Sequence, residues 1–333
     1  IEKVYCYNCY ITMNDKEIYN DIFETTSGKQ IAETVTENSF FAMEKAIDIN
    51  VINKILSEVD LFNLKLNSNE ITSVHADSGY FSSNAMAKSN ALYELLTSNK
   101  IFDISREYLG DKFRLKCHRV YSTDSFIRGI WHTDNKNHGQ VNKTVKGLVF
   151  IICLNDTKDG EFQAIRKSHL SSRDFHASNF DEDFIKNYNK EDIVSFKYPA
   201  GSIIVFDSRT IHRAKPYYRF LWSRKSLFFQ IDNEIDDGEK IIINSSFVKN
   251  LNKELCNYLG IGKKNTMPHE PYGNSIKNLS FQNILQIQFQ LFLAITNRIF
   301  FLSKALFTGT SKRKIKNLLG IKRKNYNTDF KKK

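Results

Sequence analysis

Two histidines and one aspartate in this 333-residue chain have the residue types and the order of a metal-binding set. The segment Trp131-His132-Thr133-Asp134 places an imidazole and a carboxylate two residues apart, and His212 follows later in the chain. Side chains two residues apart on an extended segment point the same way, so His132 and Asp134 can face one site. Two imidazoles and one carboxylate occupy one face of a metal ion and leave the opposite face open, which suits Fe(II).

A His-x-Asp triplet is a weak signal alone, because a chain with eight histidines has roughly an even chance of holding one at random. A second copy, His75-Ala76-Asp77, lies in a polar stretch that we interpret as a loop before the strands begin, so we do not expect it to bind a metal. The alternative for His132 and Asp134 is a surface turn between two strands. For His212 it is a hydrogen-bonded histidine near a strand end.

The elements that must position these residues have the pattern of short strands. Phe113, Leu115 and Cys117 alternate with Arg114, Lys116 and His118, which predicts a strand with one buried face. Further strands are predicted at 147–154, 161–165, 193–198, 202–206 and 225–231. Many short strands without long helices between them indicate an antiparallel sandwich or barrel.

Helical patterns flank these strands. Apolar residues at three- and four-residue steps predict a helix within 39–66, and shorter patterns predict helices at 83–96 and 101–109, the last one ended by Gly110. Beyond about residue 232 the strand pattern fades, and an apolar stripe at 281–307 predicts another helix. Polar residues interrupt this stripe, so it falls short of a membrane span.

The order of these pieces resembles the phytanoyl-CoA dioxygenase family of Fe(II)/2-oxoglutarate oxygenases. The resemblance covers about residues 85–232, and its pieces in chain order are Arg106-Glu107-Tyr108-Leu109-Gly110, Phe113-Arg114-Leu115, Trp131-His132-Thr133-Asp134, the strand 148–154 with Asp156, Gly160-Glu161-Phe162, Ile165, Ser168-His169, Pro199-Ala200-Gly201-Ser202, Phe206-Asp207, Ile211-His212-Arg213-Ala214-Lys215-Pro216 and Arg224. One departure is Arg166-Lys167 before Ser168-His169, where the family often has Pro-Gly.

The resemblance implies a double-stranded β-helix (jelly-roll) core in which His132, Asp134 and His212 hold iron. It also implies that Arg224 holds the far carboxylate of 2-oxoglutarate, and a guanidinium offers a planar fork for that purpose. Arg213 and Arg219 are alternatives for this role, and a surface charge is the alternative for Arg224 itself. Asp134 is retained, whereas halogenating relatives replace this carboxylate with a small residue, so the resemblance favours hydroxylation.

Other residues have open roles. On the first core strand, His118 or Arg119 could contact the cosubstrate, and Ser168 and His169 either line the pocket or serve the fold. We expect four large aromatic side chains to belong to the barrel core, namely Trp131, Phe150, Phe162 and Phe206. Cys6-x-x-Cys9 resembles half of a zinc site, but no second cysteine pair or nearby His-x-x-x-His completes it.

Charge is concentrated at the C-terminal end. Of the net charge of +11, residues 312–333 hold ten Lys or Arg and one Asp, which gives +9 and leaves +2 for the rest. Such a tail is usually solvated. It could also contact an anionic membrane surface peripherally. Nucleic acid is a less favoured partner, because few aromatic residues lie between the charged residues of the tail. Five cysteines form no disulfide framework, which favours a reducing, cytoplasmic location.

We therefore expect a mainly β protein with flanking helices. Residues 1–110 are predicted to form a mainly helical region packed on the barrel, 111–235 the catalytic double-stranded β-helix, and 236–333 a helical extension with the basic tail. The expected activity is Fe(II)/2-oxoglutarate-dependent hydroxylation, with dioxygen, of a C–H bond in a small-molecule or carrier-linked substrate. The alternative is a non-catalytic jelly-roll binding or scaffold protein that acts through its basic extension.

Overall fold

Two antiparallel β-sheets face each other in the computed structural model, which describes residues 15–59, 72–75, 79–124, 129–134, 145–171, 179–216 and 223–267, and the single residues 292, 296 and 299. The large sheet has the order β1 (Phe40–Met43), β10 (Ile203–Asp207), β6 (Gly147–Cys153), β12 (Ser223–Asp232), β4 (Arg114–Asp124), β3 (Gly79–Ser83) and β2 (Thr72–His75). The small sheet has the order β8 (Asn179–Phe180), β5 (Trp131–His132), β11 (His212–Ala214), β7 (Phe162–Ile165) and β9 (Ile193–Phe196). This is the predicted double-stranded β-helix.

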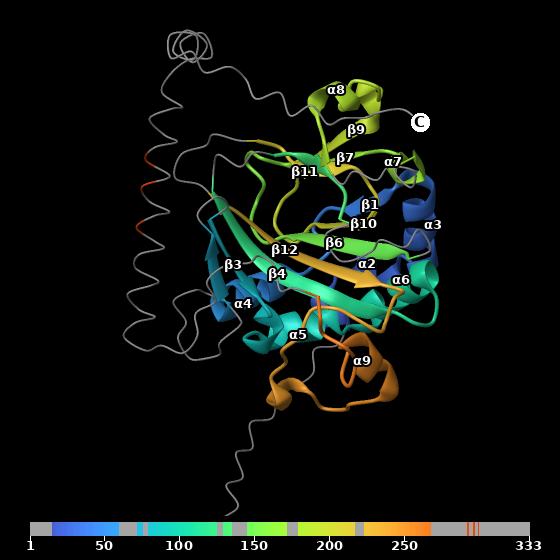
Figure 1. Cartoon of the computed structure of the whole chain (residues 1–333). Helices are drawn as coiled ribbons and strands as arrows, with labels where there is room; N and C mark the ends of the chain where they lie inside the picture. The colour runs from blue at the N-terminus through green and yellow to red at the C-terminus, as the bar shows by residue number, and fades with distance from the viewer. Residues whose placement is uncertain are drawn as a thin grey trace, which may run out of the picture.

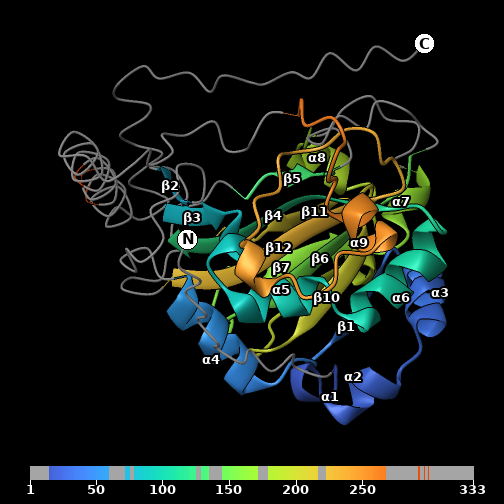
Figure 2. The ribbon, with the colours of Figure 1, turned by 90° about the horizontal axis from the view of Figure 1, so that it is seen from below.

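Helices cover the outer face of the large sheet, so the molecule has three layers (Figure 1). Viewed from that side, the helices lie across the strands (Figure 2). They are α1 (Asp15–Ile18), α2 (Asp21–Thr25), α3 (Gly28–Asn38), α4 (Ile49–Glu58), the 3-10 turn η1 (Ala85–Ala87), α5 (Asn90–Leu96), α6 (Asn99–Leu109) and α9 (Lys253–Tyr258). Short elements elsewhere are α7 (Ser168–Ser171), α8 (Glu182–Ile185), η3 (Lys190–Asp192) and η4 (Ser245–Phe247).

Alternation along the large sheet builds two separate cores. Phe150, Leu227 and Phe229 point toward the helices and join their buried residues in one cluster. Val149 and Phe206 point the other way and pack with residues of the small sheet in a second cluster. Because both faces are covered, the strands are nearly continuously apolar, which explains the run GLVFIIC of β6.

Local signals at the helix ends match the sequence. Ser98 caps α6 by accepting a hydrogen bond from the Ile101 amide, and Gly110 ends the helix at φ +89°. Only glycine adopts this conformation without strain, so the helix end predicted at Gly110 is confirmed.

The single helix predicted within 39–66 is wrong at its start. Ser39 ends α3 with a left-handed φ of 78°, and Phe40–Met43 then pairs with β10 as an edge strand before α4 begins. The strand has both faces in contact with cores, since Phe40 packs toward the small sheet and Phe41 toward the helices. An apolar run buried on both faces cannot be assigned to helix or strand from periodicity alone.

The polar stretch interpreted as a loop also differs from the prediction. It contributes β2, which pairs with β3, and β3 in turn pairs with β4. The mainly helical first third thus adds a strand at one edge of the large sheet and two at the other. The boundaries predicted at residues 110 and 235 stay predictions.

The alternation around Cys117 predicts a strand with one buried face and one exposed face. In the structure the polar side chains of this strand are buried as well. Arg114, Lys116 and Arg119 are all buried, because the segment that follows β12, residues 233–267, folds back over them. Lys116 Nζ lies 2.6 Å from a Glu234 carboxylate oxygen, and Arg119 pairs with Glu239. We call residues 233–267 the strap.

Several predictions fall largely outside the described residues. Of the helix predicted at 281–307, only Phe292, Thr296 and Ile299 are described, each of them helical. The basic tail at 312–333 and the Cys6-x-x-Cys9 pair are not described. Within the described part of the chain, no helix has the length and apolar character needed to cross a membrane.

Candidate metal centre

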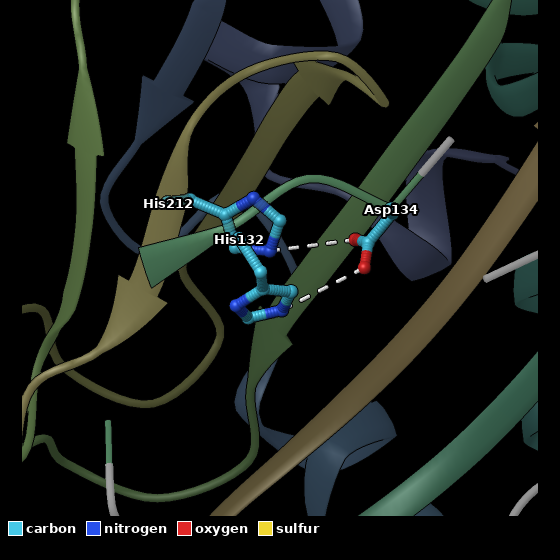
Figure 3. A group of neighbouring side chains, drawn as sticks. All are labelled: His132, Asp134 and His212. Atoms are coloured by element: carbon cyan, nitrogen blue, oxygen red, sulfur yellow. Dashed lines mark ion pairs between the residues drawn. The ribbon is translucent and has the colours of Figure 1, made fainter. Parts of the chain in front are cut away.

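Three ligand-type side chains from separate positions in the chain meet at the small sheet. His132 on β5 lies directly opposite His212 on β11 in the antiparallel register, and their ring centroids are 4.3 Å apart. Asp134 follows β5, where its amide donates a 2.9 Å hydrogen bond to the Ser208 carbonyl. Figure 3 shows both imidazoles directed at the Asp134 carboxylate.

The ligand atoms are close enough to share one ion. His132 Nε2 lies 3.7 Å from Asp134 Oδ1, and His212 Nε2 lies 3.4 Å from Asp134 Oδ2. All three ligand atoms lie within 4.8 Å of one another, and no other such group of His, Cys, Asp or Glu occurs among the residues that the structure describes. His212 and Asp134 are buried, whereas His132 is partly exposed.

Backbone carbonyls fix the tautomer of both rings. His132 Nδ1 donates to the Ile130 carbonyl at 2.8 Å, and His212 Nδ1 donates to the Thr210 carbonyl at 2.9 Å. A carbonyl oxygen can only accept, so Nδ1 carries the proton in each neutral ring and Nε2 presents a lone pair. This is the usual arrangement of a metal-ligating histidine.

Burial keeps the inner ring neutral. Desolvation lowers the pKa of His212 to about 4, although the nearby Asp134 charge acts in the opposite direction. At neutral pH the His212 ring therefore directs an Nε2 lone pair at Asp134. Asp134 Oδ2 is buried and accepts no hydrogen bond. Such a set of converging acceptors favours a cation between them, so these residues fit a bound metal ion.

Aromatic rings hold His212 in place. Phe206 and Phe162 lie with ring centroids 4.8 Å and 5.2 Å from the His212 ring. Trp131, Phe150 and Phe206 belong to the buried core as predicted, and Phe162 belongs to the core while it also lines the cavity described next.

A cavity of about 290 Å³ between the two sheets contains the three ligand-type side chains. Arg224, at the start of β12, lines the same cavity, where one arm of its guanidinium donates to the Gly160 carbonyl. Further lining residues are mainly apolar or aromatic and include Tyr121, Ile151, Phe162, Phe196, Ile204 and Phe228. The charged lining residues are Arg119, Arg224, Lys225 and Asp134.

Arg213 and Arg219 are the alternatives to Arg224 as the carboxylate-binding arginine, and Arg213 does not line the cavity. Arg213 lies with its guanidinium 4.2 Å from the Trp131 ring centroid and pairs with Glu182, so it is directed away from the cavity. Arg219 lies outside the described residues.

The first core strand presents only one of its two candidates to the cavity. His118 faces the helices, where its Nε2 accepts a hydrogen bond from the Met86 amide, whereas Arg119 lines the cavity. The buried partner of Arg119 is Glu239 of the strap. Sequence reasoning did not find Glu239, because nothing in the local pattern links residues 120 positions apart.

Ser168 and His169 serve the fold. The Ser168 hydroxyl donates to the Ile165 carbonyl and accepts from the Ile211 amide. His169 Nε2 donates to the Thr36 carbonyl, so its Nδ1 accepts from the Ser39 hydroxyl at 2.6 Å. Neither residue lines the cavity. Of the second His-x-Asp copy, the backbone of His75 is described as part of β2, while Asp77 is not described.

Comparison with known proteins gives one family. The family model described as phytanoyl-CoA dioxygenase (PhyH) matches residues 73–217, a range that includes His132, Asp134 and His212 and ends before Arg224. No curated protein matches the sequence.

Solved structures with a similar chain path include three structures of two proteins from nogalamycin biosynthesis. The non-heme alpha-ketoglutarate-dependent carbocyclase SnoK is 17% identical, with a TM-score of 0.48 over 63% of this chain and 85% of that chain. The epimerase SnoN is 15% identical, with a TM-score of 0.45 over 61% of this chain and 81% of that chain. A complex of SnoN with Fe3+, alpha-ketoglutarate and nogalamycin RO is 15% identical, with a TM-score of 0.47 over 61% and 82% of the two chains.

Proposed function

We propose that this chain, whose residues 73–217 match the model of the phytanoyl-CoA dioxygenase family, is an Fe(II)- and 2-oxoglutarate-dependent oxygenase that hydroxylates a C–H bond of a small-molecule or carrier-linked substrate. In this proposal His132, Asp134 and His212 are the iron ligands, and Arg224 binds the far carboxylate of 2-oxoglutarate. Bound iron and 2-oxoglutarate supply the oxidising chemistry, in which dioxygen, 2-oxoglutarate and a C–H bond become succinate, carbon dioxide and a hydroxyl group.

The observation that carries the proposal is the convergence of three acceptors with no donor between them. His132 and His212 direct Nε2 lone pairs at the Asp134 carboxylate, because both Nδ1 atoms are committed to backbone carbonyls. A structural histidine pair would gain more from donating to the aspartate than from facing it with lone pairs. A divalent cation resolves this arrangement and occupies one face only.

The charge of the cavity supports an anionic cosubstrate. Arg119, Arg224 and Lys225 line it against the single carboxylate of Asp134. Arg224 donates to the Gly160 carbonyl, and the five donors of a guanidinium lie in a planar fork whose shape matches a carboxylate. Arg119 is a second cation on the same wall, held by Glu239.

The apolar side chains that line the cavity support C–H oxidation of a small group. Phe196, Ile204 and Phe228 give the cavity an apolar wall, which suits the hydrocarbon part of a substrate. A volume of about 290 Å³ is small for a site that must also hold 2-oxoglutarate, because ligand pockets commonly span about 300–1,000 Å³. We therefore propose that only the reacting end of a larger or carrier-linked substrate enters.

The test is 2-oxoglutarate turnover by the purified protein supplied with Fe(II), followed as succinate formation. Asp134→Ala and His132→Ala should abolish turnover while they retain the far-ultraviolet circular dichroism of the wild type. Turnover that persists in both variants would contradict the proposal. A well-folded wild type that forms no succinate with any substrate and binds no metal would instead favour the non-catalytic binding protein.

A further inference from the structure

One four-residue turn supports two of the three proposed iron ligands. The turn Asp207-Ser208-Arg209-Thr210 connects β10 to β11 and is buried at every position. The Ser208 carbonyl accepts the Asp134 amide at 2.9 Å, and the Thr210 carbonyl accepts the His212 Nδ1 proton at 2.9 Å. A shift of this turn would therefore move a carboxylate and an imidazole together.

The Asp207 side chain organises the turn from inside. Its Oδ1 accepts the Arg209 amide at 2.7 Å, while its backbone carbonyl accepts the Thr210 amide at 2.8 Å. Asp207 is only 3% exposed, so its carboxylate depends on protein donors in place of water.

The second carboxylate oxygen is held from the helical layer. The Tyr108 hydroxyl, on the last turn of α6, donates to Asp207 Oδ2. Tyr108 lies 99 residues earlier in the chain and does not line the cavity. The contact ties α6 to the turn that leads from the large sheet to the small sheet.

We infer that Tyr108 and Asp207 are positioning residues for the metal centre, acting through the turn 207–210 on Asp134 and His212. Loss of the Tyr108 hydroxyl leaves a buried carboxylate oxygen without this donor, and the turn must relax to find another. The ligand atoms then lose their preset geometry, so metal affinity falls even though no ligand is removed. This inference rests on the proposed function.

The chain offers a matched control. Tyr258 is also a buried tyrosine whose hydroxyl donates to a single acceptor, the Leu96 carbonyl, at 2.8 Å. That bond joins α9 to the end of α5 and has no contact with the turn or the cavity. Tyr108→Phe and Tyr258→Phe thus delete the same atom in comparable surroundings.

The experiment measures Co(II) binding to the full chain by titration calorimetry, together with the d–d absorption bands and the melting temperature. Removal of groups that orient metal ligands typically weakens binding about 10- to 100-fold, so we expect Tyr108→Phe to weaken Co(II) binding at least tenfold and to change the band positions. For Tyr258→Phe we expect a Co(II) dissociation constant within about twofold of the wild-type value. This should hold even if the melting temperatures of both variants fall below that of the wild type by a similar amount.

A second variant keeps the test decisive if Tyr108→Phe does not fold. Asp207→Asn retains Oδ1 for the Arg209 amide and offers an amide donor to the tyrosine oxygen, so it should fold and show an intermediate loss of affinity. Wild-type affinity and wild-type bands in a folded Tyr108→Phe protein would overturn the inference and leave the proposed function intact. Where Tyr108→Phe does not fold, the same result in Asp207→Asn would overturn it. If the wild type itself fails to bind Co(II), the proposed function falls and the inference with it.

Discussion

His212 Nε2 and Asp134 Oδ2 lie 3.4 Å apart, and the neutral His212 ring has no proton to donate across this contact. The ring proton of His212 is committed to the Thr210 carbonyl, and burial lowers the pKa of His212 to about 4. Two acceptors in contact at a buried position are unfavourable unless a cation joins them. The pair therefore predicts that this protein is more stable with metal than without it.

Metal binding should raise the melting temperature. A ligand at 100 times its dissociation constant stabilises the folded state by about 2.7 kcal/mol, which corresponds to an increase of several degrees. We expect Mn(II) to raise the melting temperature of the wild type and to leave His212→Gln unchanged. The control is His118→Gln, because His118 faces the helices and should keep the full metal-dependent increase. An equal increase in His212→Gln would place the bound metal elsewhere.

Cosubstrate binding should depend on the shape of Arg224 as well as its charge. Arg224→Lys keeps the positive charge in the cavity but loses the planar fork, so we expect 2-oxoglutarate to bind the Mn(II)-loaded protein at least tenfold more weakly. Calorimetry on the metal-loaded protein measures this change.

The matched variant is Arg213→Lys. Arg213 lies over Trp131 and pairs with Glu182 away from the cavity, so its replacement should leave 2-oxoglutarate affinity within about twofold. A larger effect at Arg213 than at Arg224 would reverse the assignment.

The strap contributes to stability through a buried ion pair. Arg119 and Glu239 have side chains only 2% and 4% exposed, and their contact connects the cavity wall to the strap. Glu239→Gln leaves the Arg119 charge without its counter-charge, and breaking a buried pair by removing one partner costs about 3–5 kcal/mol. Urea denaturation should detect this loss.

The double variant Arg119→Met/Glu239→Leu provides the comparison for the ion pair. It removes both charges, so it should recover much of the stability lost in Glu239→Gln. A Glu239→Gln protein as stable as the wild type would mean that the contact does not contribute.

Thiol reactivity should distinguish the three described cysteines. Burial raises the pKa of the Cys117 thiol and also that of Cys153, so both stay protonated at pH values where an ordinary thiol begins to react. Cys256 is only half-buried. Alkylation of the native protein at pH 8, followed by peptide mass spectrometry, should modify Cys256 well before Cys117 and Cys153. Early modification of Cys117 would show that the large sheet opens readily.

The sequence predicted the elements whose signals are local. Strand β6 has a long apolar run, and α6 ends at a glycine that the backbone requires. The strands β5 and β11 have only two and three residues, too few to display a period, although they carry both histidines. Their positions could be inferred only from the order of motifs around them.

Contacts between residues far apart in the chain could not be predicted from the sequence. Arg114 and Lys116 have the alternation of an exposed strand face, yet they are buried because the strap more than a hundred residues later supplies their partners. The pairing of Tyr108 with Asp207 is equally non-local. Such pairings depend on how the layers stack, which periodicity along one segment does not describe.

The most direct test of the central claim is an anaerobic titration of the metal-free protein with Fe(II) and 2-oxoglutarate, monitored by visible absorption. A weak charge-transfer band should appear only when both are present and should be absent in His212→Gln. His118→Gln should give the wild-type band. A folded wild type that binds Fe(II) but develops no band with 2-oxoglutarate would contradict the account.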